Sequence, residues 1–303
     1  MIIAVFPGQG SQSPGFLTPW LALDGAADRL GAYSEWAGVD LVAAGTEWDA
    51  DRIRDTQVAQ PLIVAASLLS WNSLSGRSRI SGVAGHSVGE FAAAVAAGIL
   101  SEEDALRLVG IRGRAMAEAA AIERTGMSAV IGGDESAVIE RLTELDLTPA
   151  NYNGGGQIVA AGSLDALQSL SAGPPAATRV IPLQVAGAFH TRFMAPAVET
   201  LREAAAEVAA SDPRITIWSN RDGGPVASGA AFVDLLVDQV ASPVRWDLCM
   251  ASFAADGVSG IIELSPAGTL IGLAKRALRG IPGVAVKTPD DLTAVAALTG
   301  DPA

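Results

Sequence analysis

One short stretch constrains the fold of this chain most. The motif Gly-His-Ser-Val-Gly at 85–89 stands between an apolar run at 80–84 and an Ala-rich stretch at 91–97. This order predicts a strand, a sharp turn and a helix. Such a turn strains the backbone of its central residue, which small neighbours permit, and it lifts the Ser87 hydroxyl clear of the sheet. We therefore interpret Ser87 as the nucleophile of a nucleophile elbow; the alternative is a Gly-rich turn with an incidental serine.

A serine hydroxyl is a weak nucleophile that needs a base, and histidine is the usual one. The chain has two histidines, His86 and His190. His86 directly precedes Ser87, and consecutive side chains leaving a strand point to opposite faces, so His86 is badly placed to reach the serine. We therefore predict His190 as the base; its alternative role is that of a hydrogen-bonded structural histidine. The helix is expected to begin at Val88, whose backbone N–H would then point toward an oxyanion on the acylated serine.

The composition narrows the function classes. Half of the 303 residues are hydrophobic and 17% are charged, so we expect a large core of about two domains, or one core with an insertion. A net charge of -13 argues against nucleic acid or an anionic membrane surface as the main partner. The single cysteine, Cys249, excludes an internal disulfide and fits a reducing compartment. No signal peptide or membrane-spanning run is recognisable, so we expect a cytoplasmic protein.

The order of the predicted elements indicates an α/β fold. Strands that alternate with helices predict a mainly parallel sheet with helices on both faces, and the elbow makes this core hydrolase-like. We expect the core at 1–124 and 186–303, interrupted at 125–185 by an inserted ferredoxin-like subdomain. The insert has the order β-α-β-β-α-β, predicted at 127–131, 135–145, 148–152, 157–161, 164–170 and 178–183.

The elements of the core follow from apolar periodicity and from Gly, Pro and Ser punctuation. Strands are predicted at 2–6, 215–219, 260–264 and 285–287, and helices at 25–38, 62–74, 101–121, 194–209, 231–240, 246–255 and 269–278. A helical stretch is also expected from Ile53 onward, with Pro61 as the first residue of the helix at 62–74. The tail from Pro289 is expected to form a loose helix.

Arg112 interrupts an apolar helix face. At about 100° per residue, the helix at 101–121 places Arg112 in the middle of a stripe of apolar residues from Ala105 to Ala119. A buried guanidinium stays charged and is costly without a partner. That partner is either a carboxylate of this chain or a carboxylate of the substrate, held bidentately beside Ser87.

Several motifs together carry a resemblance to a known family. They are Phe-Pro-Gly-Gln-Gly-Ser-Gln at 6–12, Gln-Pro at 60–61, Gly-His-Ser-Val-Gly-Glu at 85–90, Arg-Gly-Arg-Ala-Met at 112–116, Asn-Tyr-Asn at 151–153, Gly-Ala-Phe-His at 187–190, Gln239 with Pro-Val-Arg-Trp at 243–246, and Glu-Leu-Ser-Pro-Ala-Gly at 263–268. Over essentially its full length the chain resembles the malonyl-CoA:acyl carrier protein transacylases, which are stand-alone acyltransferases of fatty acid synthesis. The chain departs from many relatives at Gly155 and at 265–267, away from the expected chemistry.

This resemblance implies the reaction and its residues. The implied roles are Ser87 as the acylated nucleophile, His190 as its base, the backbone N–H groups of Gln9 and Val88 as the oxyanion hole, Arg112 as the partner of the malonyl carboxylate, the backbone carbonyl of Gln239 as the group that orients His190, and Phe189 as the residue typical of malonyl preference. The implied reaction transfers malonyl from malonyl-CoA to the phosphopantetheine thiol of acyl carrier protein, by a ping-pong mechanism through malonyl-serine. It needs no bound cofactor and no metal. We expect a monomer, with acyl carrier protein and malonyl-CoA as partners.

Two other functions use some of the same residues. A serine hydrolase has the same elbow, but it places its histidine near the C-terminus and gives no reason for Arg112. A non-catalytic scaffold gives no reason for Ser87 and His190. The pathway, fatty acid or polyketide, is left open by the sequence. For docking of an acidic carrier protein, two basic clusters are candidates: Arg77 with Arg79, and Lys275 with Arg276 and Arg279.

Overall fold

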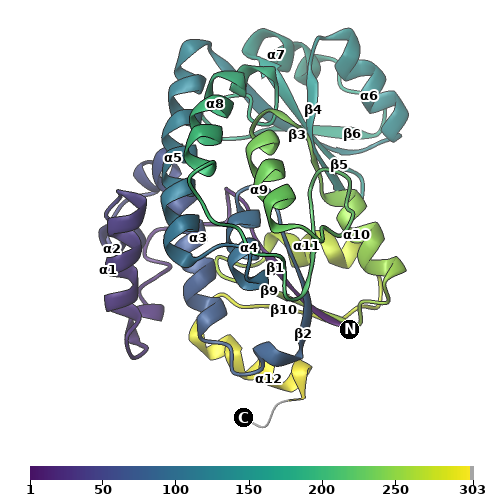
Figure 1. Ribbon diagram of the computed structural model, residues 1–303. Coiled ribbons are helices and arrows are strands. Elements are labelled where there is room, and N and C mark those ends of the chain that lie inside the picture. Colours follow the sequence, from purple (N-terminus) through teal and green to yellow (C-terminus); the bar gives the residue numbers. More distant parts are fainter. Residues whose placement is uncertain (301–303) are drawn as a thin grey trace.

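The computed structural model describes residues 1–300 and contains two sheets, the lower and the upper in Figure 1. The lower one, sheet A, has the order β10-β9-β1-β2-β7, and all of its paired strands are parallel. Its strands are β1 (Ile2–Phe6), β2 (Ile80–Gly85), β7 (Thr216–Trp218), β9 (Gly260–Glu263) and β10 (Gly283–Ala285). The predicted parallel sheet of an α/β fold is thus confirmed, with β1 at its centre.

Helices cover both faces of sheet A because its central strands are apolar on both sides. Along β1, Ala4 and Phe6 pack into one core and Ile3 and Val5 into another, as the two-residue period of a strand requires. The first core contains α3 (Thr56–Asn72), α4 (Gly89–Ala97) and α5 (Glu102–Ile122). The second contains α10 (Trp246–Ala255) and α11 (Thr269–Ala277).

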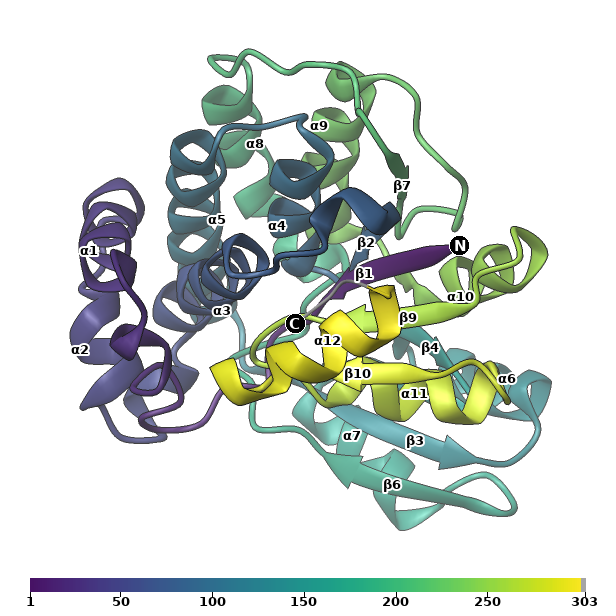
Figure 2. The ribbon, with the colours of Figure 1, turned by 90° about the horizontal axis from the view of Figure 1, so that it is seen from below.

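The remaining helices of the core form an outer layer. They are α1 (Ala26–Ala37), α2 (Leu41–Thr46), α8 (Ala195–Ala205), α9 (Gly229–Asp238) and α12 (Leu292–Thr299). In Figure 2, α1 and α2 lie on the far side of α5 and α3 from sheet A, and α12 lies beside β10. Short 3-10 turns lie at Trp20–Ala22, Arg52–Arg54, Arg77–Arg79, Arg192–Met194, Gln239–Ala241 and Pro289–Asp291. Within residues 1–300, none of the helices has both the length and the apolarity that crossing a bilayer demands.

The upper sheet, sheet B, has the order β6-β3-β5-β4-β8. Its strands are β3 (Thr125–Gly132), β4 (Thr148–Gly154), β5 (Gln157–Ser163), β6 (Thr178–Pro182) and β8 (Val244–Arg245). The first four, with α6 (Glu135–Glu144) and α7 (Leu164–Ala172), have the predicted order β-α-β-β-α-β. β8 was not predicted: it comes from outside 125–185 and pairs parallel to β4. A strand of two residues is too short to show the alternation of apolar and polar residues by which a strand is recognised in a sequence.

The two faces of sheet B have different neighbours. Val130 and Ile158 pack against Leu142 of α6 and Leu167 of α7, in a third apolar core. The alternate residues of β3 and β5 turn the other way, toward sheet A. Sheet B therefore presents one face to its own helices and one to the top of the core.

Some predicted boundaries were wrong. Pro61 lies inside α3 and is not its first residue, because Asp55 caps the helix by accepting from the Gln57 N–H at 3.1 Å. Burial of the helix from Val58 onward outweighs the hydrogen bond that Pro61 cannot make. The residues before α3, Arg52–Arg54, form a 3-10 turn, so the helical stretch predicted from Ile53 onward begins at Thr56 instead. The last strand ends at Ala285, two residues before its predicted end, and α8 ends at Ala205.

Candidate active site

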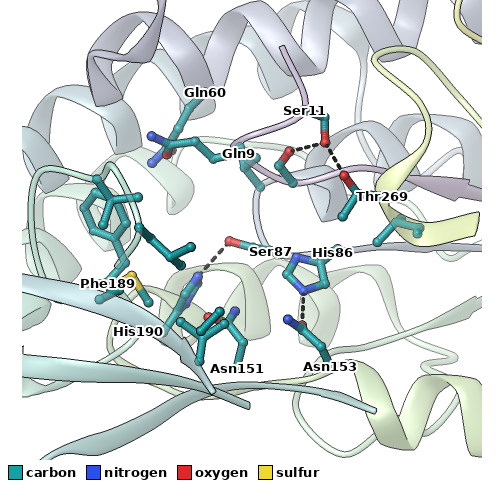
Figure 3. Close-up of a pocket in the computed structure, with 18 of the residues that line it drawn as sticks. Gln9, Ser11, Gln60, His86, Ser87, Asn151, Asn153, Phe189, His190 and Thr269 are labelled. Carbon is teal, nitrogen blue, oxygen red and sulfur yellow. Dashed lines mark hydrogen bonds between the residues drawn. The ribbon is translucent and has the colours of Figure 1, made fainter. Parts of the chain in front are cut away.

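A cavity of about 200 Å³ lies between the two sheets. Its lower side is formed by the segments that follow β1 and β2, at the carboxyl edge where open α/β sheets bind ligands. Its upper side is formed by the free face of sheet B, including Ala129, Asn151 and Val159. Figure 3 shows Ser87 and His190 joined by a hydrogen bond at this cavity, which Gln9 and Phe189 also line.

Ser87 sits on the strand-to-helix turn with a φ of 52°, in the left-handed region that strains a residue with a side chain. Gly85 and Gly89 are required because a larger residue at either position would clash with the backbone of its neighbours. A Cβ at Gly85 would lie 2.1 Å from the Glu90 backbone nitrogen, and one at Gly89 would lie 2.2 Å from the Phe6 carbonyl oxygen. The small residues of the motif therefore let β1, β2 and α4 pack closely enough to hold the serine in this conformation.

His190 is the histidine in contact with Ser87. Its Nε2 lies 2.8 Å from Ser87 Oγ, and its Nδ1 lies 2.8 Å from the backbone carbonyl oxygen of Gln239. A carbonyl only accepts, so Nδ1 carries the proton and the lone pair of Nε2 faces the serine hydroxyl. Burial, together with the charge of Arg112, lowers the pKa of His190 to about 3. The imidazole is therefore neutral and able to accept a proton at physiological pH.

His86 points away from the serine (Figure 3). Its Nε2 lies 2.9 Å from Asn153 Oδ1 of β4, and its ring packs edge-on against Trp246. Burial lowers its pKa. His86 and Ser87 thus point in different directions, as expected for consecutive residues that leave a strand. His190 contacts Ser87, whereas His86 connects sheet A to sheet B.

Two backbone amides at the cavity are free to receive an oxyanion. Their neighbours are occupied: the Ser87 N–H donates to Asn220 Oδ1 at 2.7 Å, and the Gly89 N–H donates to the His86 carbonyl at 3.0 Å. Among residues 1–300, neither the Gln9 N–H nor the Val88 N–H has an acceptor. Both residues line the cavity, and Val88 precedes the first turn of α4, where amides point outward.

Arg112 is buried at the cavity, with 1% of its surface exposed. Its Nη1 donates to Gln60 Oε1 at 2.6 Å and its Nη2 to Gln239 Oε1 at 3.1 Å, so amide oxygens hold it in place. Its Nε has no partner in the described structure. Burial lowers its pKa to about 10, and Glu90 opposes that shift. The guanidinium therefore remains charged and keeps unused N–H donors, and the side chain lines the same cavity as Ser87.

Four side chains of this site were not assigned a role from the sequence. Gln60, Glu90 and Asn153 lie in motifs of the family, whereas Asn220 lies just beyond the end of β7. Asn220 carried a usable signal, since it is a polar residue directly after the strand predicted at 215–219, at the carboxyl edge of a parallel sheet. Glu90 is 1% exposed; burial raises its pKa, whereas the Asn220 N–H and the Arg112 charge oppose that shift and favour the carboxylate.

Phe189 lies directly before His190 and lines the cavity with 6% of its surface exposed. Like Ser87, His190 has a left-handed backbone, with a φ of 61°. Phe189 and His190 therefore direct their side chains to different parts of the same cavity (Figure 3). The aromatic ring therefore forms part of the wall of the cavity that Ser87 also lines.

Comparison with known proteins gives one consistent result. Residues 3–295 match the acyl transferase domain family. The chain is 55% identical to the malonyl CoA-acyl carrier protein transacylase of Mycobacterium tuberculosis strain H37Rv over 98% of this chain and 100% of that protein. It is 33% identical to the transacylase of the same name from Escherichia coli K12, over 96% of this chain and 97% of that protein.

Solved structures agree with the sequence matches. The crystal structure of the Mycobacterium tuberculosis protein named MCAT is similar with a TM-score of 0.94 and 54% identity, covering 98% of this chain and all of that chain. A malonyl-transacylase in complex with its type II PKS acyl-carrier protein is similar with a TM-score of 0.90 and 30% identity, covering 99% of both chains. This chain is therefore an acyltransferase that belongs to the family of malonyl CoA-acyl carrier protein transacylases.

Proposed function

We propose that this protein transfers the malonyl group from malonyl-CoA to the phosphopantetheine thiol of acyl carrier protein, in two half-reactions joined by malonyl-Ser87. One observation carries the proposal. The cavity that holds the Ser87 and His190 pair, 2.8 Å apart, also contains a buried arginine with unused donors. A nucleophile activated by a base accounts for acyl transfer, and a buried cation accounts for an acyl group that ends in a carboxylate.

In the first half-reaction, Ser87 Oγ attacks the thioester carbonyl while its proton moves to His190 Nε2. The carbonyl oxygen becomes an oxyanion and accepts hydrogen bonds from the Gln9 and Val88 amides. The Gln239 carbonyl accepts from Nδ1 throughout and stabilises the imidazolium, in the position that an aspartate takes in a Ser-His-Asp triad. Collapse of the intermediate breaks the C–S bond, and the CoA sulfur takes the proton from Nε2.

The second half-reaction reverses these steps with a different thiol. His190 Nε2 takes the proton of the phosphopantetheine thiol, and the sulfur attacks the malonyl-Ser87 ester. The same two amides receive the oxyanion. When the C–O bond breaks, Ser87 Oγ takes the proton back, so the enzyme returns to its starting state. The relative solved with its acyl-carrier protein supports such a protein acceptor.

For the carrier protein, we propose docking beside the exposed cluster of Lys275, Arg276 and Arg279. This cluster lies on and directly after α11, whose first residues line the cavity. Arg77 and Arg79 precede β2 and thus lie at the opposite end of that strand from Ser87. Reversing the charge of Lys275 and Arg276 is expected to raise the KM for carrier protein without changing acylation by malonyl-CoA.

The proposed function is tested by mixing the protein with malonyl-CoA and measuring its intact mass. We expect a malonyl adduct that is absent from Ser87→Ala, persists without acceptor and disappears on addition of phosphopantetheinylated acyl carrier protein. Rapid release of free malonate without an adduct would instead identify a hydrolase, and no reaction at all would leave only a scaffold.

A further inference from the structure

We propose that Glu90 is a positioning residue for acyl-group selection: through the side-chain amide of Gln239, it holds Arg112 ready for the carboxylate of the substrate. This role rests on the proposed function, because it concerns how the malonyl group is recognised. Glu90 does not line the cavity and touches no reacting atom. It therefore acts only through the residues it holds.

Glu90 lies behind the site, on the first turn of α4. Its Oε1 accepts from the backbone N–H of Asn220 at 2.7 Å, and its Oε2 accepts a short hydrogen bond from Gln239 Nε2. The other end of the Gln239 amide, Oε1, accepts from Arg112 Nη2. Glu90, Gln239 and Arg112 thus form a buried chain of hydrogen bonds that ends at the cavity.

This chain has a fixed direction. A guanidinium can only donate, so the oxygen of the Gln239 amide must face Arg112 and its NH2 group must face Glu90. Both Glu90 oxygens receive N–H groups, so the amide is stable in this orientation. Glu90 thereby keeps an acceptor in front of Arg112, while the other guanidinium end is held by Gln60.

A glutamine at position 90 breaks this arrangement. The Asn220 N–H belongs to the backbone and cannot turn away, so the new side chain must offer its oxygen to Asn220 and its NH2 group to Gln239. If the Gln239 amide keeps its orientation, its NH2 group faces the NH2 group of the new side chain. If the amide turns over, its NH2 group faces Arg112 instead. Either way Arg112 loses the orientation set by Gln239. The Gln239 backbone carbonyl, which orients His190, is not part of the amide.

The test compares acylation of Glu90→Gln by malonyl-CoA with acylation by 4-nitrophenyl acetate, which reports on Ser87 and His190 without needing a carboxylate partner. We expect kcat/KM for malonyl-CoA to fall on the order of tenfold or more relative to the ester, the size of one lost hydrogen bond to a charged group. Equal losses with both substrates would overturn the proposal. A wild-type protein that reacts with the ester but never with malonyl-CoA would overturn the proposed function itself.

Two further variants make the test specific. In Gln239→Met, which has a similar shape but no amide, adding Glu90→Gln should cost little more malonyl transfer; a full additional loss would show that Glu90 acts by another route. Gln239→Met alone should show the same selective loss, and it decides the question if Glu90→Gln does not fold. The matched control is Glu263→Gln, another fully buried carboxyl that accepts two N–H groups, from Leu270 and Ile271. It should lower stability but leave the ratio of the two substrates unchanged.

Discussion

Replacing Arg112 with alanine separates recognition of the acyl carboxylate from acyl transfer itself. In Arg112→Ala the serine, its histidine and the two amides keep their contacts, because Arg112 contacts neither Ser87 nor His190 through a hydrogen bond. The variant removes only the Arg112 side chain, which carries the buried cation at the cavity. Malonyl transfer should therefore collapse, whereas acetyl transfer should be kept or improved, since acetyl leaves the buried charge unpaired in the wild type.

The size of the loss follows from burial. With 1% of its surface exposed and its guanidinium held by two amides, Arg112 offers the substrate a preorganised and desolvated partner. Removing one member of a buried charged pair costs about 3–5 kcal/mol. We therefore expect kcat/KM for malonyl-CoA to fall by about 10² to 10⁴, while the value for acetyl-CoA changes by less than about tenfold.

The assay is competitive acylation of Ser87 by mixtures of malonyl-CoA and acetyl-CoA, read by intact mass. The variant also leaves Gln60 Oε1 and Gln239 Oε1 without their donor, so its unfolding must be measured in parallel. A folded Arg112→Ala that loses malonyl and acetyl transfer in equal measure would refute the reasoning, because Arg112 would then serve the chemistry or the fold and not the choice of acyl group.

Four further predictions concern the histidine variants, the acyl pocket, and the pH dependence of acylation and of stability. His190→Ala should leave only slow residual acylation, whereas His86→Ala removes contacts to Asn153 and Trp246 but none to Ser87 and should be milder; the reverse order in a rapid-mixing assay would exclude His190 as the base. Phe189→Ser should favour methylmalonyl over malonyl by about 1–3 kcal/mol relative to the wild type, and an unchanged ratio in a competition assay would place Phe189 outside the acyl pocket. Because the pKa of His190 is held at about 3, acylation should stay constant between pH 7 and pH 5, a range over which the neutral fraction of an ordinary histidine falls about 25-fold; an inflection near pH 6.5 would contradict this. Both histidines have lowered pKa values in the folded protein, so the unfolded chain binds these protons more readily and the free energy of unfolding should fall as pH drops below about 6.5.

Much of the fold could be predicted because its signals are local. Buried parallel strands are short apolar runs, and the β-α-β-β-α-β order of sheet B is punctuated by turns and by capping residues such as Ser163. The approach of Ser87 to His190 could be anticipated because the chain offers one elbow and two histidines. When a residue type that the chemistry requires is this rare in a chain, its long-range contact can be predicted without a structure.

The rest of the site depends on contacts that leave no local pattern. Asn220 meets the Ser87 amide across 133 positions of sequence, and Gln239 meets Glu90 across 149. Amide hydrogen bonds of this kind have no periodicity, and the same residue types are common on surfaces. The open question of the Arg112 partner has a similar cause: periodicity predicts burial, whereas only the structure shows that amide oxygens, and no ion pair within residues 1–300, hold the guanidinium.

The pairing of β8 with β4 has a consequence for synthesis on the ribosome. The edge strand of sheet B beside β4 is β8 (Val244–Arg245), and β1, the first strand made, gains its neighbour β9 only later still. Sheet B therefore cannot be completed before about four fifths of the chain have emerged, and sheet A, whose last strand is β10, only later; closing such long loops is slow. Until then β1 and β4 each have an open edge, which invites pairing with other nascent chains. A nascent chain that already carries Ser87 thus has no finished cavity in which to react, so acyl transfer begins only when translation is nearly complete.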